Sequence, residues 1–196
     1  MNFINKGFFT VFLLSTLVFC QAVIADSNRF TLMPNPQSTK QQLGEYQVTE
    51  NVLLNIEGMS ERRLQFTTQY ISKRLSKAQI AIINEATFEQ SNSLSQIHII
   101  VNNGAEVEFI LPSLDQNESY QLVINERGIE IIADNDFGAL RGIETLLQLI
   151  STQSSKASLS IPHLEINDFP RFPWRGLMID SVRHFISIAT IKRQLD

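Results

Sequence analysis

Cysteine is nearly missing from this sequence. The 196 residues contain one cysteine, Cys20, which lies in an apolar leader that we expect to be removed. A chain without cysteine has neither a disulfide framework nor a cysteine nucleophile. The mature protein therefore depends on a hydrophobic core. Its 43% hydrophobic and 18% charged residues are typical of a globular protein rather than a disordered one.

Basic runs and metal-binding clusters are missing as well. The net charge is −4 and no block of lysine and arginine occurs, so we expect no nucleic-acid partner. His98, His163 and His184 are too scattered to form a metal site, and no partner is predicted for His98 or His163. The "DND" stretch (134–136) lacks the ligand spacing of a calcium loop, and Asp136 is interpreted as a helix cap. We expect no metal and no cofactor.

The first 25 residues have the three regions of a signal peptide. A polar start with Lys6 is followed by the apolar stretch "GFFTVFLLSTLVF" and by "CQAVIA", which ends in a small residue. Val23 and Ala25 suit the positions before a cleavage site. We therefore place cleavage after Ala25 and expect export to the periplasm or the cell exterior, with no stable membrane span left. The alternatives are a retained membrane anchor and lipid attachment at Cys20.

Residues 26–167 have the pattern of one α+β domain with an antiparallel or mixed sheet. The period-2 spacing of Val48, Val52, Leu54 and Ile56 predicts a strand or two. "IHIIV" (97–101) predicts a compact buried strand. "SYQLVIN" (119–125) and "GIEIIA" (128–133) predict two strands that are joined by a glycine-containing turn.

Two main helices are predicted, over residues 61–77 and 134–151, from apolar residues at helical spacing. Ser60 can cap the first helix. Gly138 and Gly142 lie four residues apart on one face of the second. Glycine inside a helix costs about 1 kcal/mol relative to alanine. Either a close packing contact requires these glycines or the helix merely tolerates them.

Residues 168–196 begin a different kind of structure. Pro170 and Pro173 mark an extended linker, and "RGLMID" (175–180) predicts a strand for a sheet that is covered on both faces. Ser187 can cap a helix that runs to the last residue. One strand and one helix do not make a domain, because the strand has no neighbour. We therefore expect these residues to open a second domain and to expose apolar surface when they stand alone.

Three stretches resemble glycoside hydrolase family 20, the β-N-acetylhexosaminidases. "DFPRFPWRGLMIDSVRHF" (168–185) resembles the entry into the catalytic barrel of that family. "NESYQLVINERGIEIIADNDFGALRGIETLLQLI" (117–150) resembles the strand–strand–helix end of its non-catalytic N-terminal domain. "LMPNPQS" (32–38) resembles the opening strand of the same domain. The resemblance covers nearly all of residues 30–196 in order.

This resemblance implies an α+β domain followed by the first strand and helix of an incomplete (β/α)8 barrel. It implies removal of terminal β-linked N-acetylglucosamine or N-acetylgalactosamine with retention, in which the acetamido oxygen of the substrate attacks the anomeric carbon. An adjacent aspartate–glutamate pair performs the acid–base work further along the family's barrel. No aspartate precedes a glutamate directly in this chain, so we expect the chain alone to be inactive. Whether the chain is a fragment or the product of a truncated gene stays open.

The resemblance also implies that Arg183 binds the outer hydroxyls of the terminal sugar. It lies just past the carboxyl end of the expected barrel strand, where barrel enzymes build their sites, and a guanidinium offers several donors in a fixed fork. The alternative is an ordinary surface arginine. Asp180 orients Arg183, lines the edge of the site, or only caps the strand end. His184 either supports the same site or is structural. Arg175, at the opposite end of the strand, is interpreted as structural.

Two functions from different classes are compatible with these patterns. The first is the N-terminal part of an exported β-N-acetylhexosaminidase that acts on chitin- or glycan-derived sugars. The second is a non-catalytic carbohydrate-binding or interaction module. Such a module usually exposes aromatic residues for sugar stacking, whereas the sequence has one tryptophan, Trp174, which belongs to the expected barrel entry. The first hypothesis is therefore favoured, with a carbohydrate as the partner.

Overall fold

The computed structural model describes residues 32–83, 94–104, 113–153 and 159–195. The predicted signal peptide, its cleavage after Ala25 and the lipidation alternative at Cys20 lie outside the described residues. No helix among the described residues is long and apolar enough to cross a membrane.

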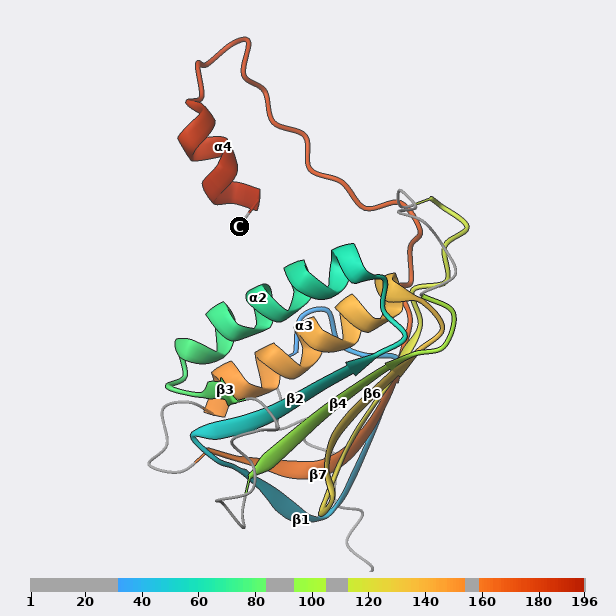
Figure 1. The fold of residues 1–196 in the computed structure, drawn as a ribbon. Coiled ribbons are helices and arrows are strands. Elements are labelled where there is room, and N and C mark those ends of the chain that lie inside the picture. Colours follow the sequence, from blue (N-terminus) through green and yellow to red (C-terminus); the bar gives the residue numbers. More distant parts are fainter. Residues whose placement is uncertain (1–31, 84–93, 105–112, 154–158, 196) are drawn as a thin grey trace, which may run out of the picture. The chain divides into compact units, whose positions relative to one another are not determined.

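A seven-stranded mixed sheet forms the centre of the fold (Figure 1). Its spatial order is β1-β7-β5-β6-β4-β2-β3. Strands β2, β3, β4 and β6 run parallel to their neighbours in that group, whereas β5 pairs antiparallel with β6 and β7, and β7 pairs antiparallel with β1. The strands are β1 (Ser38–Val48), β2 (Asn51–Glu57), β3 (Ala81–Ile83), β4 (Ser95–Val101), β5 (Tyr120–Asn125), β6 (Gly128–Ala133) and β7 (Leu159–Asp168).

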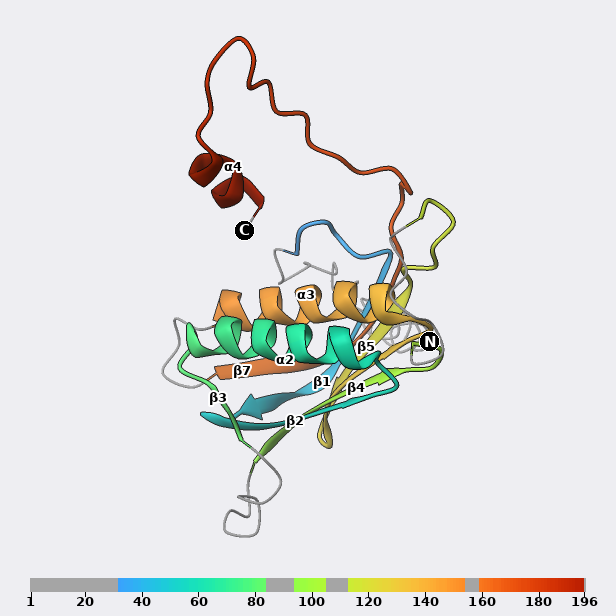
Figure 2. The same ribbon diagram turned by 45° about the horizontal axis from the view of Figure 1, so that its top comes forward.

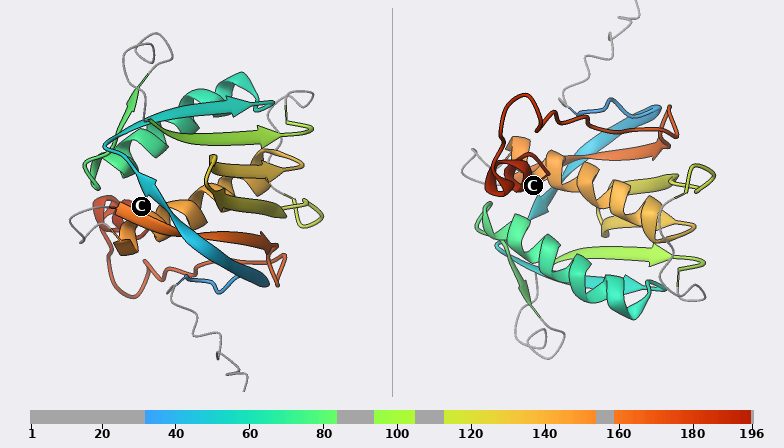
Figure 3. Two further views of the ribbon diagram at one scale, coloured as in Figure 1. Left: turned by 90° about the horizontal axis from the view of Figure 1, so that it is seen from below. Right: turned by 90° about the horizontal axis from the view of Figure 1, so that it is seen from above.

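Two helices cover one face of this sheet, α2 (Glu61–Ser76) and α3 (Asp136–Gln153). Both lie on the same side of the strands in Figure 2, and the two panels of Figure 3 show first the strands and then the helices in front. Side chains alternate along each strand, so every second residue faces the helices. The fully buried members of this core include Ile97, Ile99, Leu122, Ile124, Ile131, Ile143, Leu149, Leu164 and Ile166. The predicted α+β class with a mixed sheet and two main helices is confirmed.

The two glycines of α3 are there because the helix packs closely on the sheet. A Cβ atom on Gly138 would lie 2.2 Å from the backbone oxygen of Ser119, and one on Gly142 would lie 2.7 Å from Cγ2 of Ile131. Both distances are far below a van der Waals contact. Of the two alternatives left open by the sequence, the close packing contact is the one that the structure shows.

The predicted cap of the second helix is wrong by one residue. The side-chain oxygen of Asn135 accepts hydrogen bonds from the backbone N–H groups of Phe137 (2.9 Å) and Gly138 (3.2 Å), so Asn135 caps α3. Asp136 is instead the first residue of the helix and is buried. Asparagine and aspartate are equally good caps, and the sequence "DND" did not distinguish them.

The buried carboxylate of Asp136 joins the starts of the two helices. Its Oδ2 atom lies 3.2 Å from Nε of Arg63 and accepts a hydrogen bond of 3.0 Å from the hydroxyl of Ser60. Ser60 occupies the N-cap position of α2, but its side chain makes no capping hydrogen bond. The predicted N-cap position of Ser60 is therefore confirmed, but its side chain makes no capping bond, because its hydroxyl donates to the carboxylate of the neighbouring helix.

Two edge strands were not predicted. β1 begins at Ser38, so the opening strand expected within "LMPNPQS" is absent there, in keeping with the missing N–H groups of Pro34 and Pro36. Its sequence STKQQLGEYQV is mostly exposed and gives little apolar alternation. β3 has only three residues, fewer than a periodicity can reveal.

Residues 169–195, the described part of the chain after β7, form no further strand. Residues 174–180 carry no regular structure, so the predicted strand over 175–180 is not formed. Leu177 is 66% exposed and Met178 is 95% exposed, because no other described strand pairs with this stretch. A single helix follows, α4 (Ile188–Leu195), and the hydroxyl of Ser187 accepts a hydrogen bond of 3.3 Å from the N–H of Thr190 at its start. The predicted cap of this helix is confirmed.

Candidate functional site

Asp180 and Arg183 form a tight turn in the segment that follows β7. The Oδ1 atom of Asp180 accepts hydrogen bonds from the backbone N–H groups of Val182 (3.0 Å) and Arg183 (3.2 Å). Its Oδ2 atom pairs with Nε of Arg183, three residues later. One carboxylate therefore fixes both the backbone of the turn and the side chain of Arg183, the candidate sugar-binding residue. We call these residues, 180–183, the arginine turn.

The carboxylate of the arginine turn is held in its charged form. Hydrogen bonds from the backbone and side chain of Arg183 and from the backbone of Val182 lower the pKa of Asp180 below its ordinary value. The Arg183 side chain is 88% exposed. Its Nη1 and Nη2 atoms make no hydrogen bond to another described residue, so the pair holds Nε and leaves the outer nitrogens of the guanidinium as donors. The hypothesis that Asp180 orients Arg183 agrees with this geometry, whereas the strand-end cap does not apply, because no strand is formed over 175–180.

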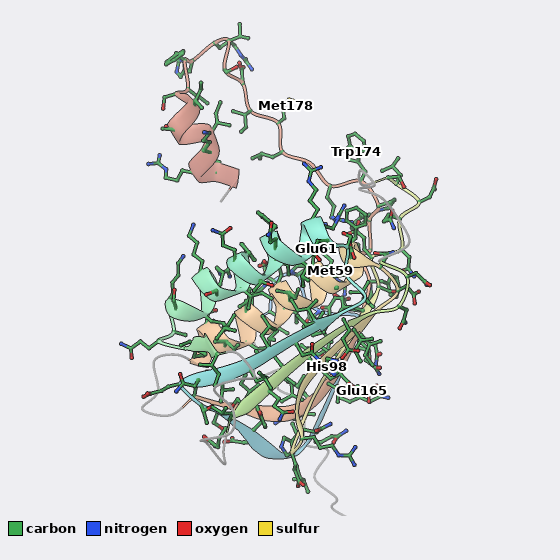
Figure 4. The ribbon with its side chains drawn as sticks, in the orientation of Figure 1. Met59, Glu61, His98, Glu165, Trp174 and Met178 are labelled. Carbon is green, nitrogen blue, oxygen red and sulfur yellow. The ribbon has the colours of Figure 1, made fainter. Side chains whose placement is uncertain are left out.

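The neighbours of the arginine turn contribute less. His184 is exposed, and its Nδ1 atom lies 2.7 Å from the carbonyl oxygen of Arg183, so it contacts the backbone and not the guanidinium. Trp174 and Met178, labelled in Figure 4, belong to the extended segment before the turn and are 77% and 95% exposed. The structure thus brings together Asp180 and Arg183, and it leaves His184 beside them without a side-chain contact to either.

Sequence reasoning missed Glu118, which lies at the junction between the sheet domain and this segment. Its two carboxylate oxygens accept hydrogen bonds of 2.6 Å from Nη2 of Arg175, and one of them also accepts a hydrogen bond of 2.6 Å from Nε of Arg141 on α3. This contact agrees with the structural role interpreted for Arg175, whose partner lies 57 residues away. A contact over that separation leaves no periodic signal in the sequence.

A second polar cluster connects the end of β7 with β5 and α3. The hydroxyl of Tyr120 lies 2.6 Å from the hydroxyl of Thr145 and 3.2 Å from Oδ2 of Asp168, while Oδ1 of Asp168 accepts a hydrogen bond of 2.9 Å from the N–H of Gln37. Burial, together with the charge of Asp168, raises the pKa of Tyr120, although the Thr145 hydroxyl opposes this. The phenol therefore stays protonated and acts as a structural hydrogen-bonding group.

Three cavities of the described chain lie away from the arginine turn. A groove of about 830 Å³ runs between α2 and α3, and a pocket of about 440 Å³ lies at the junction between Met33, α3 and the residues from Asp168 to Arg175. Another, of about 430 Å³, lies beside the ends of β5 and β7. Neither Asp180 nor Arg183 lines any of the three.

The remaining polar residues that the sequence singled out have structural partners. His98, labelled on the sheet in Figure 4, points away from the helices, and its Nε2 atom lies 3.0 Å from a carboxylate oxygen of Glu57. His163 is buried, and its Nδ1 atom lies 3.1 Å from the carbonyl oxygen of Leu43. The expectation that these two histidines lack partners is wrong, because strands adjacent in the sheet supply them. The described residues contain no group of three or more His, Cys, Asp or Glu side chains that could hold a metal ion.

Comparisons with known proteins agree with the arrangement of a sheet domain and a following segment. Residues 29–169 match the family model "Glycosyl hydrolase family 20, domain 2", and residues 172–196 match the model "Glycosyl hydrolase family 20, catalytic domain". The first match alone covers more than half of the chain.

Individual relatives give the same result. The beta-hexosaminidase subunit beta of Sus scrofa is 42% identical over 103 residues, which cover 53% of this chain and 19% of that protein. The beta-hexosaminidase subunit A2 of Dictyostelium discoideum is 28% identical over 187 residues, which cover 93% of this chain and 32% of that protein. The solved structure of a chitobiase from Flavobacterium johnsoniae matches with a TM-score of 0.65 and 34% identity, over 84% of this chain and 24% of that one. The chain thus spans about a third or less of these relatives.

Proposed function

The chain belongs to glycosyl hydrolase family 20, and from this premise we propose that it is the N-terminal part of an exported exo-β-N-acetylhexosaminidase. In the complete protein, the enzyme hydrolyses terminal β-linked N-acetylglucosamine or N-acetylgalactosamine from chitin-derived or glycan-derived sugars. The observation that carries the proposal is the order of the two family matches, because a domain-2 match is followed directly by the start of a catalytic domain.

The arginine turn supplies the part of the mechanism that this chain can perform. Asp180 holds Nε of Arg183, so the guanidinium is oriented before a sugar arrives. Its two outer nitrogens can then donate to adjacent hydroxyls of the terminal sugar, which a single ammonium group cannot do in the same geometry. A residue held in place in this way loses less conformational freedom on binding. Arg183 is therefore proposed as a sugar-binding residue and Asp180 as the residue that positions it.

The cleavage chemistry belongs to residues that this chain does not contain. In a retaining, substrate-assisted reaction, the acetamido oxygen of the sugar attacks the anomeric carbon while an acid protonates the leaving oxygen. We propose an adjacent aspartate–glutamate pair in the rest of the barrel for orienting the acetamido group and for the acid–base steps. The 196 residues contain no aspartate directly followed by glutamate, so the chain by itself is proposed to be inactive.

Export is proposed from the leader. The polar, apolar and small-residue regions of residues 1–25 support removal of the leader after Ala25. Mass spectrometry of the protein recovered from the native host should give a mature N-terminus at Asp26. A retained leader, or a lipid on Cys20, would replace this part of the proposal with an anchored enzyme.

An activity assay tests the function. The 196-residue chain and a version that continues through the rest of the barrel are each incubated with a chromogenic N-acetyl-β-glucosaminide. We expect release of the chromophore by the longer protein alone, because acid assistance accounts for about 10²–10⁴ of the rate. Turnover by the 196-residue chain, after host enzymes have been removed, would contradict the proposal that the acid–base residues lie in the rest of the barrel. If the longer protein binds chito-oligosaccharides without cleaving them, the carbohydrate-binding alternative holds instead.

A further inference from the structure

Glu118 is the point at which three parts of the chain meet. It lies just before β5, Arg141 lies on α3, and Arg175 lies beyond the end of β7 in the segment that matches the catalytic domain. The Glu118 side chain is only 13% exposed, whereas those of Arg141 and Arg175 are 50% and 40% exposed. A mostly buried carboxylate is therefore held between two partly exposed guanidinium groups. We call these three residues the Glu118 latch.

The carboxylate of the latch is charged under ordinary conditions. Burial alone would favour its neutral form, but hydrogen bonds and charge from Arg175 and Arg141 outweigh burial and lower the pKa of Glu118. Charge-assisted hydrogen bonds are about twice as strong as neutral ones. A neutral side chain of the same shape at position 118 would therefore weaken both contacts while leaving the packing intact.

The latch is the last tie between the sheet domain and the segment that follows. Asp168, the last residue of β7, contacts Gln37 and Tyr120, and Arg171 donates to the carbonyl oxygen of Asn35 just after the strand. Arg175 is the next anchored residue. From Gly176 onward, the hydrogen bonds of the described residues stay within the segment itself. The direction in which residues 176–183 leave the sheet domain is thus set at Arg175.

We propose that Glu118 is a positioning residue that, through Arg175, fixes the start of the catalytic domain against α3. It thereby sets the position of the arginine turn relative to the sheet domain. The consequence for catalysis rests on the proposed function, whereas the latch itself rests on the contacts of Glu118, Arg141 and Arg175. When the contact between Glu118 and Arg175 is broken, Arg175 is free to move. The hydrogen bonds that then join the segment to the sheet domain are those of Asp168 and Arg171. The arginine turn, a few residues further on, then has no fixed position relative to the sheet domain.

Bond-specific proteolysis of the 196-residue chain tests the latch. Trypsin cleaves after an arginine only when that side chain leaves its partners and enters the protease pocket. The bond after Arg175 therefore reports on the latch, and the bond after Arg183, whose side chain is 88% exposed, serves as an internal reference in the same segment. Early cleavage at the two bonds is measured by mass spectrometry, and the ratio of the two rates is the readout.

We expect Glu118→Gln to raise the ratio of cleavage after Arg175 to cleavage after Arg183 by about tenfold, which corresponds to about 1.4 kcal/mol. Glu165→Gln is the matched control: it makes the same substitution on β7, where Glu165 accepts hydrogen bonds from Gln121 and Asn167. It should leave the ratio unchanged. An equal ratio in the wild-type protein and Glu118→Gln, with both folded by circular dichroism, would overturn the latch.

A second variant keeps the test valid if Glu118→Gln fails to fold. Arg175→Lys lies outside the sheet and remains a trypsin site, but an ammonium cannot reproduce the fork of donors that now contacts Glu118 and the carbonyl oxygen of Phe172. Cleavage after position 175 should again rise relative to cleavage after Arg183. No rise in this variant would also overturn the proposal. Neither outcome depends on glycosidase activity, so failure of the latch and failure of the proposed function are distinguishable.

Discussion

Two stretches of this chain have similar sequences and opposite environments. Strand β6, "GIEIIA", and residues 176–179, "GLMI", each follow a glycine with bulky apolar side chains. Ile131 in the first is 0% exposed, whereas Met178 in the second is 95% exposed. β6 lies between β5 and β4 and beneath α3, while no other described strand pairs with 176–179. Apolar sequence therefore shows where a segment can be buried, and neighbouring strands decide whether it is.

Truncation of the two apolar side chains should give the largest contrast. Ile131→Ala leaves a cavity in the core under α3, and such changes cost about 2–5 kcal/mol. Met178→Ala removes a side chain that packs on nothing in the described chain, so the free energy of unfolding should not change measurably. Urea titration followed by circular dichroism measures both. A cost for Met178→Ala comparable to that of Ile131→Ala would show that residues 176–179 are part of the core.

Glycine substitutions sharpen the same contrast. A Cβ on Gly138 would collide with the backbone oxygen of Ser119, whereas one on Gly176 would meet only Nε1 of Trp174 at 3.8 Å. Overpacking in a tight contact costs about 1–3 kcal/mol, so Gly138→Ala should lower the melting temperature despite the higher helix propensity of alanine. Gly176→Ala should leave it unchanged. Equal melting temperatures for the two variants would mean that α3 shifts freely over β5.

Removal of a helix cap should have a smaller effect, and again only in the sheet domain. Asn135→Ala deprives α3 of both capping hydrogen bonds, a loss of about 1 kcal/mol. Ser187→Ala deprives α4 of its cap, but the described contacts of α4 include no packing on the sheet. The global unfolding transition should therefore move in the first variant and stay in place in the second. A shift in Ser187→Ala as large as in Asn135→Ala would argue that α4 unfolds together with the sheet.

The smallest effect is the pH dependence of the Glu118 latch. Its folded pKa lies below the ordinary value of 4.5, so its contribution to stability is complete above that value and is lost as the pH falls through the lower folded pKa. The difference in unfolding free energy between the wild-type protein and Glu118→Gln should be constant, at about 1 kcal/mol, from pH 7 to pH 5. It should shrink as the pH falls below 4. A difference that grows towards low pH would contradict a lowered pKa.

The core of the fold was predictable because its signals are local. Period-2 apolarity predicted β2, a compact apolar run predicted β4, and two apolar stretches around a glycine-containing turn predicted β5 and β6. Helical spacing predicted α2 and α3, with ends that agree within a few residues. β1 was not predictable in the same way. It is an exposed edge strand of mostly polar residues, and its neighbour in the sheet, β7, lies more than a hundred residues later in the sequence. The order of the strands likewise depends on contacts that no local pattern records.

The candidate site was predictable only in part. The pairing of Asp180 with Arg183 acts over three residues and was anticipated as one of three roles for Asp180. Glu118 was missed because both of its partners come from distant elements, and His163 because its partner is a backbone carbonyl in β1. Residues 175–180 show the opposite failure. Their local pattern strongly predicted a strand, but no other described strand pairs with them, and the strand is not formed. The sugar-binding role of Arg183 was inferred from resemblance and stays a prediction.

Sugar binding by the arginine turn is tested most directly by the kcat/KM of Arg183→Ala in the protein extended through its barrel. Hydrogen bonds from a charged donor contribute about 1.5–3 kcal/mol each, so loss of two should lower kcat/KM by roughly two to four orders of magnitude. Arg183→Lys should recover little of this loss. Arg193→Ala, an exposed arginine on α4, should leave kcat/KM unchanged. A folded Arg183→Ala enzyme with near-normal kcat/KM would contradict the assignment of the sugar contact to this turn.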